Sequence, residues 1–222
     1  MIKRILLGII FFLLGAAAAL GIYFAKNHSV PEPIITIGKK TGNFEPTKFS
    51  LENAPSDSIK GQIINMAGDI WRQSRTATEP AKLSEPAIIQ QGEVLIASDS
   101  GKITVNFGPA ATLTLFPETQ VEIVQTLALN LVFNQTQGSA QYQATGSSPI
   151  TVRSLNLIVN LDNGLLNVDT GKETGEIILS LKTGQAAVAY NSPDFISKIW
   201  QLEPGDVFSY DSNERKGYFN AP

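Results

Sequence analysis

Carboxylates are the only abundant reactive side chains in this sequence. Glu118 and Glu122 flank a predicted strand, and Asp162, Asp169 and Asp206 lie in or beside predicted turns. A glycosidase needs two acids about 5–10 Å apart across a cleft, and nothing in the spacing of these residues indicates such convergence. Acids in turns usually hydrogen-bond the local backbone. We therefore expect structural roles for them and no enzymatic activity.

Residue types that commonly carry catalysis or metals are almost missing. The chain has no cysteine and one histidine, His28. A thiol nucleophile, a disulfide, a cysteine-based zinc site and a Ser-His-Asp triad are therefore excluded for a single chain. We expect no cofactor and no metal.

Four short motifs resemble sites and are more typical of turns. Lys182-Thr183 and Ser197-Lys198 place a hydroxyl beside a lysine without the sequence signature of a Ser-Lys enzyme. Asp99-Ser100-Gly101 and Asp162-Asn163-Gly164 offer oxygen ligands but lack the spacing of an EF-hand calcium loop. Turn geometry explains all four without a ligand.

Aromatic residues are the remaining candidates for ligand binding. Trp71, Tyr142, Tyr190, Trp200 and Tyr210 lie in predicted strands. They could line a sugar- or peptide-binding face, but aromatic residues on half-buried strands mostly pack in the core. The sequence alone assigns no ligand-binding residue.

The charge distribution argues against nucleic acid as a partner. Residues 1–26 hold three of the 17 basic residues and none of the 20 acidic residues, so the rest carries 14 bases against 20 acids. Phosphate binding needs clustered lysine and arginine. A mildly acidic domain also should not adhere to an anionic leaflet.

The chain begins with an apolar segment that is long enough to span a bilayer. Residues 5–24 are 20 uncharged residues, and at about 1.5 Å each a helix of this length crosses the hydrocarbon core. Lys3 and Arg4 precede the segment, so residues 1–4 should form a cytoplasmic stub and the remainder should lie outside. A cleaved signal peptide, with small residues at Ala16–Ala19, is the alternative. Both interpretations export the domain.

A spacer follows the apolar segment. Residues 25–58 contain four prolines, and only Ile34–Ile37 has the composition of a strand. We expect a tether of roughly 30 residues that spans about 30 Å as a flexible chain.

Residues 59–212 alternate between strand and turn signals. In residues 101–124, Val105, Phe107, Leu113, Leu115, Val121 and Ile123 mark one apolar face, which predicts a β-meander. Asp162-Asn163-Gly164 and Lys182-Thr183-Gly184 predict hairpin turns, and Glu203-Pro204-Gly205-Asp206 predicts a type II turn.

These signals together predict an all-β fold. We count about twelve short strands with turns every 8–12 residues, which is typical of an antiparallel β-sandwich or jelly-roll-like domain. A short β-helical roll is the alternative. Residues 213–222 are expected to form a tail.

The order and spacing of the strand and turn segments resemble the FecR domain family of bacterial envelope proteins. The matching segments are Gly61–Ile63, Ala67–Ile70 with Arg75, Ile89–Leu95, Ser98–Phe107, Ala111–Leu115, Pro117–Ile123, the segment up to Gly184, and Leu202–Asp206. The resemblance implies a jelly-roll-like β-domain outside the cytoplasmic membrane. It also implies signalling, because well-known members relay iron-siderophore signals from an outer-membrane receptor to a cytoplasmic sigma factor.

This sequence differs from those regulators in two places. They carry a sigma-binding cytoplasmic domain, whereas only residues 1–4 precede the apolar segment here. The family's central Gly-Thr-x-Phe-like stretch is matched only loosely, by Gly164–Val168.

We therefore expect a single-pass protein of the bacterial cytoplasmic membrane with its β-domain outside. The bilayer would contact residues 5–24, and the domain would act as a binding or scaffold module for an envelope protein or polymer. Transmembrane signalling in the manner of the FecR family is the second hypothesis.

Overall fold

The computed structural model describes residues 57–145, 148–171 and 173–219. Its secondary structure there consists of fifteen strands: β1 (Gly61–Ala67), β2 (Ile70–Gln73), β3 (Ala81–Lys82), β4 (Ile88–Ile89), β5 (Val94–Ala97), β6 (Lys102–Phe107), β7 (Ala111–Leu115), β8 (Gln120–Leu127), β9 (Asn130–Ala144), β10 (Ile150–Ser154), β11 (Leu157–Thr170), β12 (Glu176–Asn191), β13 (Ser197–Leu202), β14 (Val207–Asp211) and β15 (Lys216–Phe219).

No helix of the described part is long and apolar enough to cross a membrane. The predicted membrane segment, residues 5–24, and almost all of the predicted tether, residues 25–58, lie outside the described residues. Both stay predictions.

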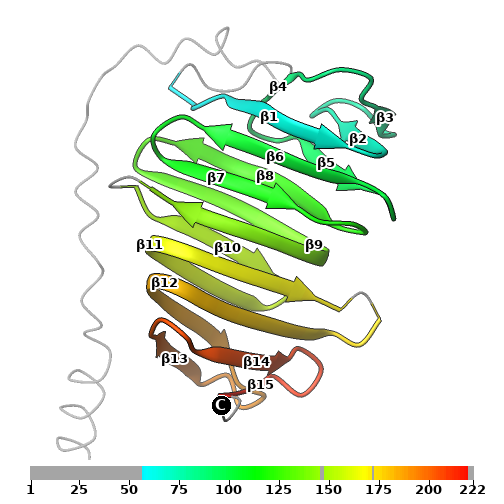
Figure 1. Cartoon of the computed structure of the whole chain (residues 1–222). Helices are drawn as coiled ribbons and strands as arrows, with labels where there is room; N and C mark the ends of the chain where they lie inside the picture. The colour runs from blue at the N-terminus through cyan, green and yellow to red at the C-terminus, as the bar shows by residue number, and fades with distance from the viewer. Residues whose placement is uncertain (1–56, 146–147, 172, 220–222) are drawn as a thin grey trace, which may run out of the picture. The chain divides into compact units, whose positions relative to one another are not determined.

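The strands form two layers that share one hydrogen-bonded network (Figure 1). The front layer runs in the order β4, β1, β6, β7, β9, β11, β12, β14, β15, and the back layer in the order β3, β2, β5, β8, β9, β10, β11, β12, β13. β9, β11 and β12 belong to both layers because one half of each strand pairs in front and the other half behind. The all-β prediction is confirmed.

Glycines let the long strands bend from one layer to the other. β11 and β12 turn side by side at the paired residues Gly164 and Gly184, which have φ of 113° and 89°. A Cβ on Gly184 would lie 1.7 Å from the Asn163 carbonyl oxygen, so only glycine fits this corner. The predicted hairpins at residues 162–164 and 182–184 are therefore wrong: the positive φ is present, but it bends continuous strands.

Three other expectations about strand order are also corrected. β10 pairs with β9 in parallel, so the layers are mixed and not purely antiparallel. In the predicted meander of residues 101–124, β6 pairs with β7, but β8 crosses to the back layer and pairs with β5 and β9. β15 lies within residues 213–222, where a tail was expected.

The core fills the space between the layers. All six residues of the predicted apolar face in residues 101–124 are completely buried, which confirms that face. Aromatic rings connect the layers: the ring of Phe133 from the back half of β9 lies 5.4 Å from Phe107 and 5.6 Å from Tyr142 of the front layer. Off-centre ring pairs at such distances add to the stability gained by burial.

A buried hydrogen-bond network lies where β9 changes layers. The Tyr142 hydroxyl donates to Gln135 Oε1 at 3.0 Å, and Gln135 Nε2 donates to the carbonyls of Gly138 and Val168 at 2.6 and 3.1 Å. Because buried polar groups are costly unless paired, this network fixes the position of the β9 bend relative to β11.

Candidate binding edge

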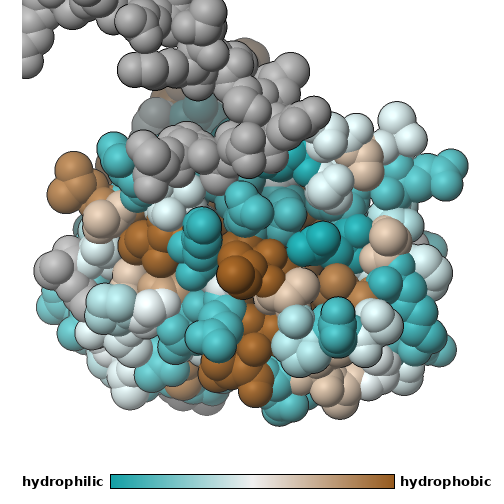
Figure 2. All heavy atoms as spheres, turned by 90° about the horizontal axis from the view of Figure 1, so that it is seen from above, coloured by the Kyte–Doolittle hydropathy of each residue, from teal (hydrophilic) through white to brown (hydrophobic). Residues whose placement is uncertain are grey.

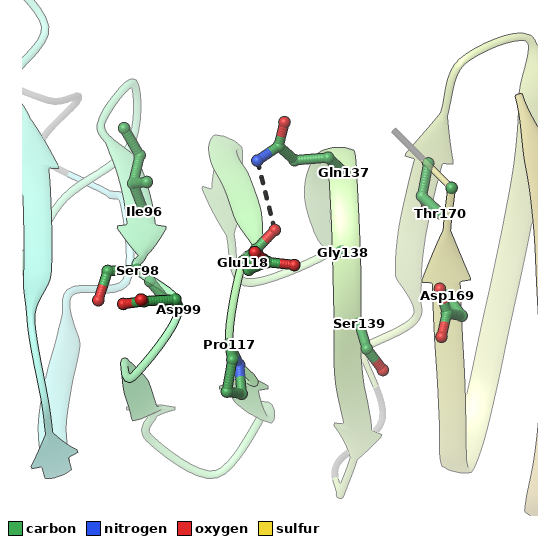
Figure 3. A pocket seen from close by; sticks show the side chains of 12 residues that line it. Ile96, Ser98, Asp99, Pro117, Glu118, Gln137, Gly138, Ser139, Asp169 and Thr170 are labelled. Carbon is green, nitrogen blue, oxygen red and sulfur yellow. Dashed lines mark hydrogen bonds between the residues drawn. The ribbon is translucent and has the colours of Figure 1, made fainter. Parts of the chain in front are cut away.

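A groove of about 540 Å³ collects three of the carboxylates (Figure 3). Asp99, Glu118 and Asp169 line it together with the bend of β9, where Gln137 Nε2 donates to the Glu118 carbonyl at 3.3 Å. No group of three or more Asp, Glu, His or Cys side chains that could hold a metal ion occurs among the described residues.

Two carboxylates outside this groove make structural contacts: Asp206 in a turn, as predicted, and Glu122 across the β8–β9 pair, while Asp162 lies in β11. Glu122 accepts a hydrogen bond from Asn134 Nδ2 at 3.2 Å. Asp206 accepts one from the Glu203 amide at 2.8 Å, and its own amide donates to the Glu203 carbonyl at 3.0 Å. With Gly205 at φ 99°, residues 203–206 form the predicted type II turn.

The aromatic candidates lie in the core and at both ends of the two layers. Trp71, in β2 at the N-terminal end, is 37% exposed. Tyr142 is completely buried. Tyr190, Trp200 and Tyr210 lie on β12, β13 and β14, at the C-terminal end of the two layers. The ring centroids of Tyr190 and Tyr210 are 4.8 Å apart. This C-terminal end is bounded by β13 in the back layer and by β15 in the front layer.

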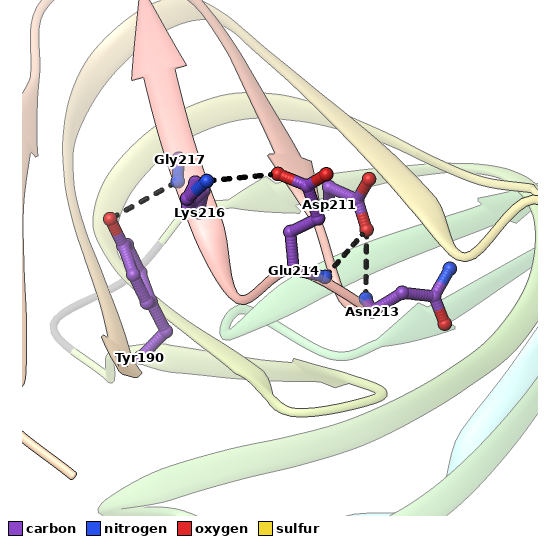
Figure 4. A network of polar contacts seen from close by, with 6 residues as sticks. All are labelled: Tyr190, Asp211, Asn213, Glu214, Lys216 and Gly217. Atoms are coloured by element: carbon purple, nitrogen blue, oxygen red, sulfur yellow. Dashed lines mark hydrogen bonds and ion pairs between the residues drawn. The ribbon is translucent and has the colours of Figure 1, made fainter. Parts of the chain in front are cut away.

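The hairpin of β14 and β15 is fixed by polar contacts (Figure 4). Asp211 Oδ1 accepts hydrogen bonds from the amides of Asn213 and Glu214 at 2.8 and 3.0 Å. The Gly217 amide donates to the Tyr190 hydroxyl at 3.1 Å, so β15 is tied to β12. These contacts hold Phe219 of β15 against Trp200 of β13, with ring centroids 5.7 Å apart.

β13 is an edge strand with an open backbone. Within the described part of the chain it pairs only with β12. The Ser192 amide donates to the Ile196 carbonyl at 2.9 Å, and hydrogen-bonded and non-hydrogen-bonded residue pairs alternate along an antiparallel ladder. In this register, Lys198 and Trp200 bond to β12, whereas Ser197, Ile199 and Gln201 direct their N–H and C=O groups to the open edge.

Each side of β13 exposes one apolar residue among polar ones, because Ser197 and Gln201 share the outer side with Ile199, and Lys198 shares the other side with Trp200. Ile199 is 68% exposed on the outer side, and Trp200 is 37% exposed on the side that faces the core. Of the six residues in the strand, only Lys198 carries a charge. Natural proteins usually protect such an edge with charges, proline or shortness.

The opposite, N-terminal end has that protection in part, because β4 covers only Gly61 and Gln62 of β1. Its edge strands β3 and β4 have two residues each. Figure 2 views this end from above and shows apolar atoms at the surface among hydrophilic ones; Ile64 and Ile88 are exposed there by 58% and 56%. The short strands offer little backbone for pairing, so we place the candidate site at β13.

Comparisons with known proteins give little further information. No family model matches this sequence, and no curated protein is significantly similar to it. Two crystal structures of a proposed anti-sigma factor from Parabacteroides distasonis ATCC 8503 match with 15% sequence identity and a TM-score of 0.49 each. The match covers 57% of this chain and 58% of that protein, so the chain spans somewhat more than half its length. Similarity at this level does not transfer a function.

Sequence reasoning found part of this site. Trp200 and Tyr190 were among the aromatic candidates, but Ile199 was not. Ser197-Lys198 is predicted as a turn and proves to be part of β13, so that prediction is wrong. No local signal in the sequence shows that this strand lies at an edge.

Proposed function

We propose that the protein is a membrane-anchored binding module of the bacterial envelope, and that β13 receives an extended segment of a partner protein. The open edge carries this proposal. Three residues of β13 direct backbone donors and acceptors away from β12, and a strand added there gains main-chain hydrogen bonds. The anchoring rests on the 20 apolar residues at positions 5–24 and stays a prediction.

The exposed apolar side chains support the same proposal. Burying about 25 Å² of apolar surface contributes roughly 0.6 kcal/mol, so covering Ile199 and Trp200 would add to the main-chain hydrogen bonds. A partner strand would thereby hide apolar surface of the kind that makes a sheet edge prone to aggregation.

Site-specific photocrosslinking in intact cells tests the proposal. A photoreactive phenylalanine replaces either Gln201, at the open edge, or Gln143, in the middle of the front layer. We expect an adduct with another protein from position 201 and none from position 143. Ile199→Pro should abolish the adduct because proline removes the outward N–H, whereas Ile199→Thr should keep it.

Two outcomes would contradict the proposal. One is an adduct at position 201 that survives Ile199→Pro, because the open backbone would then not be needed. The other is an adduct between two copies of this chain, because the edge would then serve self-association.

Signalling of the FecR type stays a prediction from the sequence. It requires that the segment at residues 5–24 passes a signal inward, so replacing that segment with an unrelated anchor should abolish a cytoplasmic response. A binding module would keep its adduct after the same replacement.

A further inference from the structure

Lys198 is the charged residue of the edge strand β13, and its charge has no counterion in the described part of the chain. It is in register with Tyr190 of β12 and lies on the same side of the strand as Trp200. The residue is exposed. Its ammonium group forms no ion pair with any residue in the described ranges, so water solvates the charge until another molecule covers it.

The backbone register brings a partner strand close to this side chain. Lys198 bonds to β12, so its own N–H and C=O groups point away from the open edge. Opposite an added antiparallel strand, such a residue belongs to a non-hydrogen-bonded pair, in which the Cα atoms are about 4.5 Å apart and the side chains lie closest. The partner residue that faces Lys198 is therefore within reach of its ammonium group.

The charge of that facing residue should decide whether the strand fits. An added strand displaces water from one flank of Lys198, and a basic residue opposite it would add repulsion, whereas a carboxylate would pair with it. The acidic residues that flank β13 in sequence, Asp194 and Glu203, lie outside Ser197–Leu202, and neither pairs with Lys198. The counterion therefore has to come from the partner.

We propose that the partner segment carries Asp or Glu opposite Lys198, and that this pair selects the segment. The inference rests on the proposed function and specifies its partner. A second copy of β13 has no acidic residue to offer, and lysine at a sheet edge commonly serves to reject unwanted strands. The same side chain thus admits an acidic segment and disfavours pairing between two copies of the chain.

Charge variants of Lys198 test the inference on the natural partner in intact cells. The photoreactive group stays at position 201, on the opposite side of the strand from Lys198. Lys198→Glu should lose most of the adduct, and Lys198→Arg should keep it because the positive charge remains. Because Lys198 is exposed, neither variant should shift the urea midpoint, which shows that a lost adduct does not come from unfolding.

Synthetic peptides test the same pair with the full-length protein in nonionic detergent. Three peptides share soluble flanks and a centre Val-Thr-X-Thr-Val in which X is Glu, Gln or Lys. The centre is symmetric, so a valine faces Trp200 in either strand direction. The fluorescence of Trp200 reports binding in a Trp71→Phe background, because the chain has two tryptophans.

The order of the three peptides is the expected result. The Glu peptide should bind about tenfold more tightly than the Lys peptide, with the Gln peptide between them. Lys198→Glu should reverse this order, and Lys198→Gln should remove it. Raising the salt concentration should shrink the preference, because salt screens exposed charges.

The outcomes separate this inference from the proposed function. If Lys198→Glu keeps the adduct at the wild-type level, or if the three peptides bind the wild-type protein equally, the charge at position 198 does not select and the inference is wrong. The proposed function then still stands as long as Ile199→Pro abolishes the adduct. If the wild-type protein forms no adduct, the proposed function fails and this inference fails with it.

Discussion

The corner of β11 and β12 and the edge strand β13 both involve β12: the corner lies within β12 at Gly184, and β13 pairs with the C-terminal half of β12. A substitution at the corner and one at the edge should change different properties. At the corner, Gly164 and Gly184 face each other with backbone atoms filling the place of any side chain. At the edge, every residue from Ser197 to Gln201 is exposed. The corner should therefore control stability and the edge should control binding.

The largest expected effect comes from filling the corner. Gly184→Ala places a methyl group against the Asn163 carbonyl and forces a left-handed φ, so it should lower the free energy of unfolding by about 3 kcal/mol. Gly108→Ala is the matched control, because Gly108 has φ 62° and no atom within 4 Å of its added Cβ. This variant should lose only about 1 kcal/mol of unfolding free energy, because the left-handed backbone conformation is its only unfavourable feature. Urea unfolding measures both, and equal losses would show that the corner can relax.

A second prediction compares two adjacent positions in β13. Lys198→Pro removes an N–H that bonds to β12, whereas Ile199→Pro removes one that faces the open edge. We expect the first to cost about 2 kcal/mol of unfolding free energy and the second under about 1 kcal/mol. Both should lose partner binding, Lys198→Pro because the strand detaches. If Ile199→Pro is the more destabilising variant, the alternation of outward and inward amides is assigned wrongly.

The sequence predicted which residues face the core, because alternation in a strand determines its buried side. It did not predict where the chain changes layers. Asn163-Gly164 has the residues of a hairpin turn, and Gly164 does adopt a positive φ. The same conformation can close a hairpin or bend a strand, and the choice depends on the pairing of β11 with β9 and β12, which is not local.

The site was less predictable for a related reason. The sequence predicts strand at Trp200–Leu202 but a turn or loop at Ser197-Lys198, whereas β13 includes all of Ser197–Leu202. Its place as the last strand of the back layer follows from the order of all the other strands. The signal for binding is the exposure of Ile199 and Trp200 on opposite sides, and that exposure exists only once the order is known.

A third prediction concerns the buried network beside the bend of β9. Tyr142→Phe leaves Gln135 Oε1 without its 3.0 Å donor in a fully buried site, so it should cost about 1–2 kcal/mol of unfolding free energy. Tyr218→Phe is the control, because Tyr218 is 53% exposed and its loss should be negligible. Neither variant should change crosslinking at position 201. A loss of the adduct in Tyr142→Phe would mean that the bend and the edge are coupled.

The smallest expected effect appears only in alkaline solution. Burial raises the pKa of Tyr142 far above its ordinary value, and burial together with Tyr190 raises the pKa of Tyr210. The unfolded chain releases these protons above about pH 10, while the folded chain keeps them, so stability is fully present below pH 10 and falls as the pH rises. Tyr142 should contribute a loss of about 0.8 kcal/mol at pH 10.5, and Tyr210 a loss in the same direction.

Tyr142→Phe separates the two contributions. This variant should remove the loss of unfolding free energy that Tyr142 causes at alkaline pH. The loss caused by Tyr210, which lies at the C-terminal end beside the binding edge, should remain. Urea unfolding between pH 8 and pH 10.5 measures the slope, and tyrosinate absorbance of the folded protein checks that Tyr142 stays protonated. An unchanged slope in Tyr142→Phe would mean that water reaches this core position in the folded state.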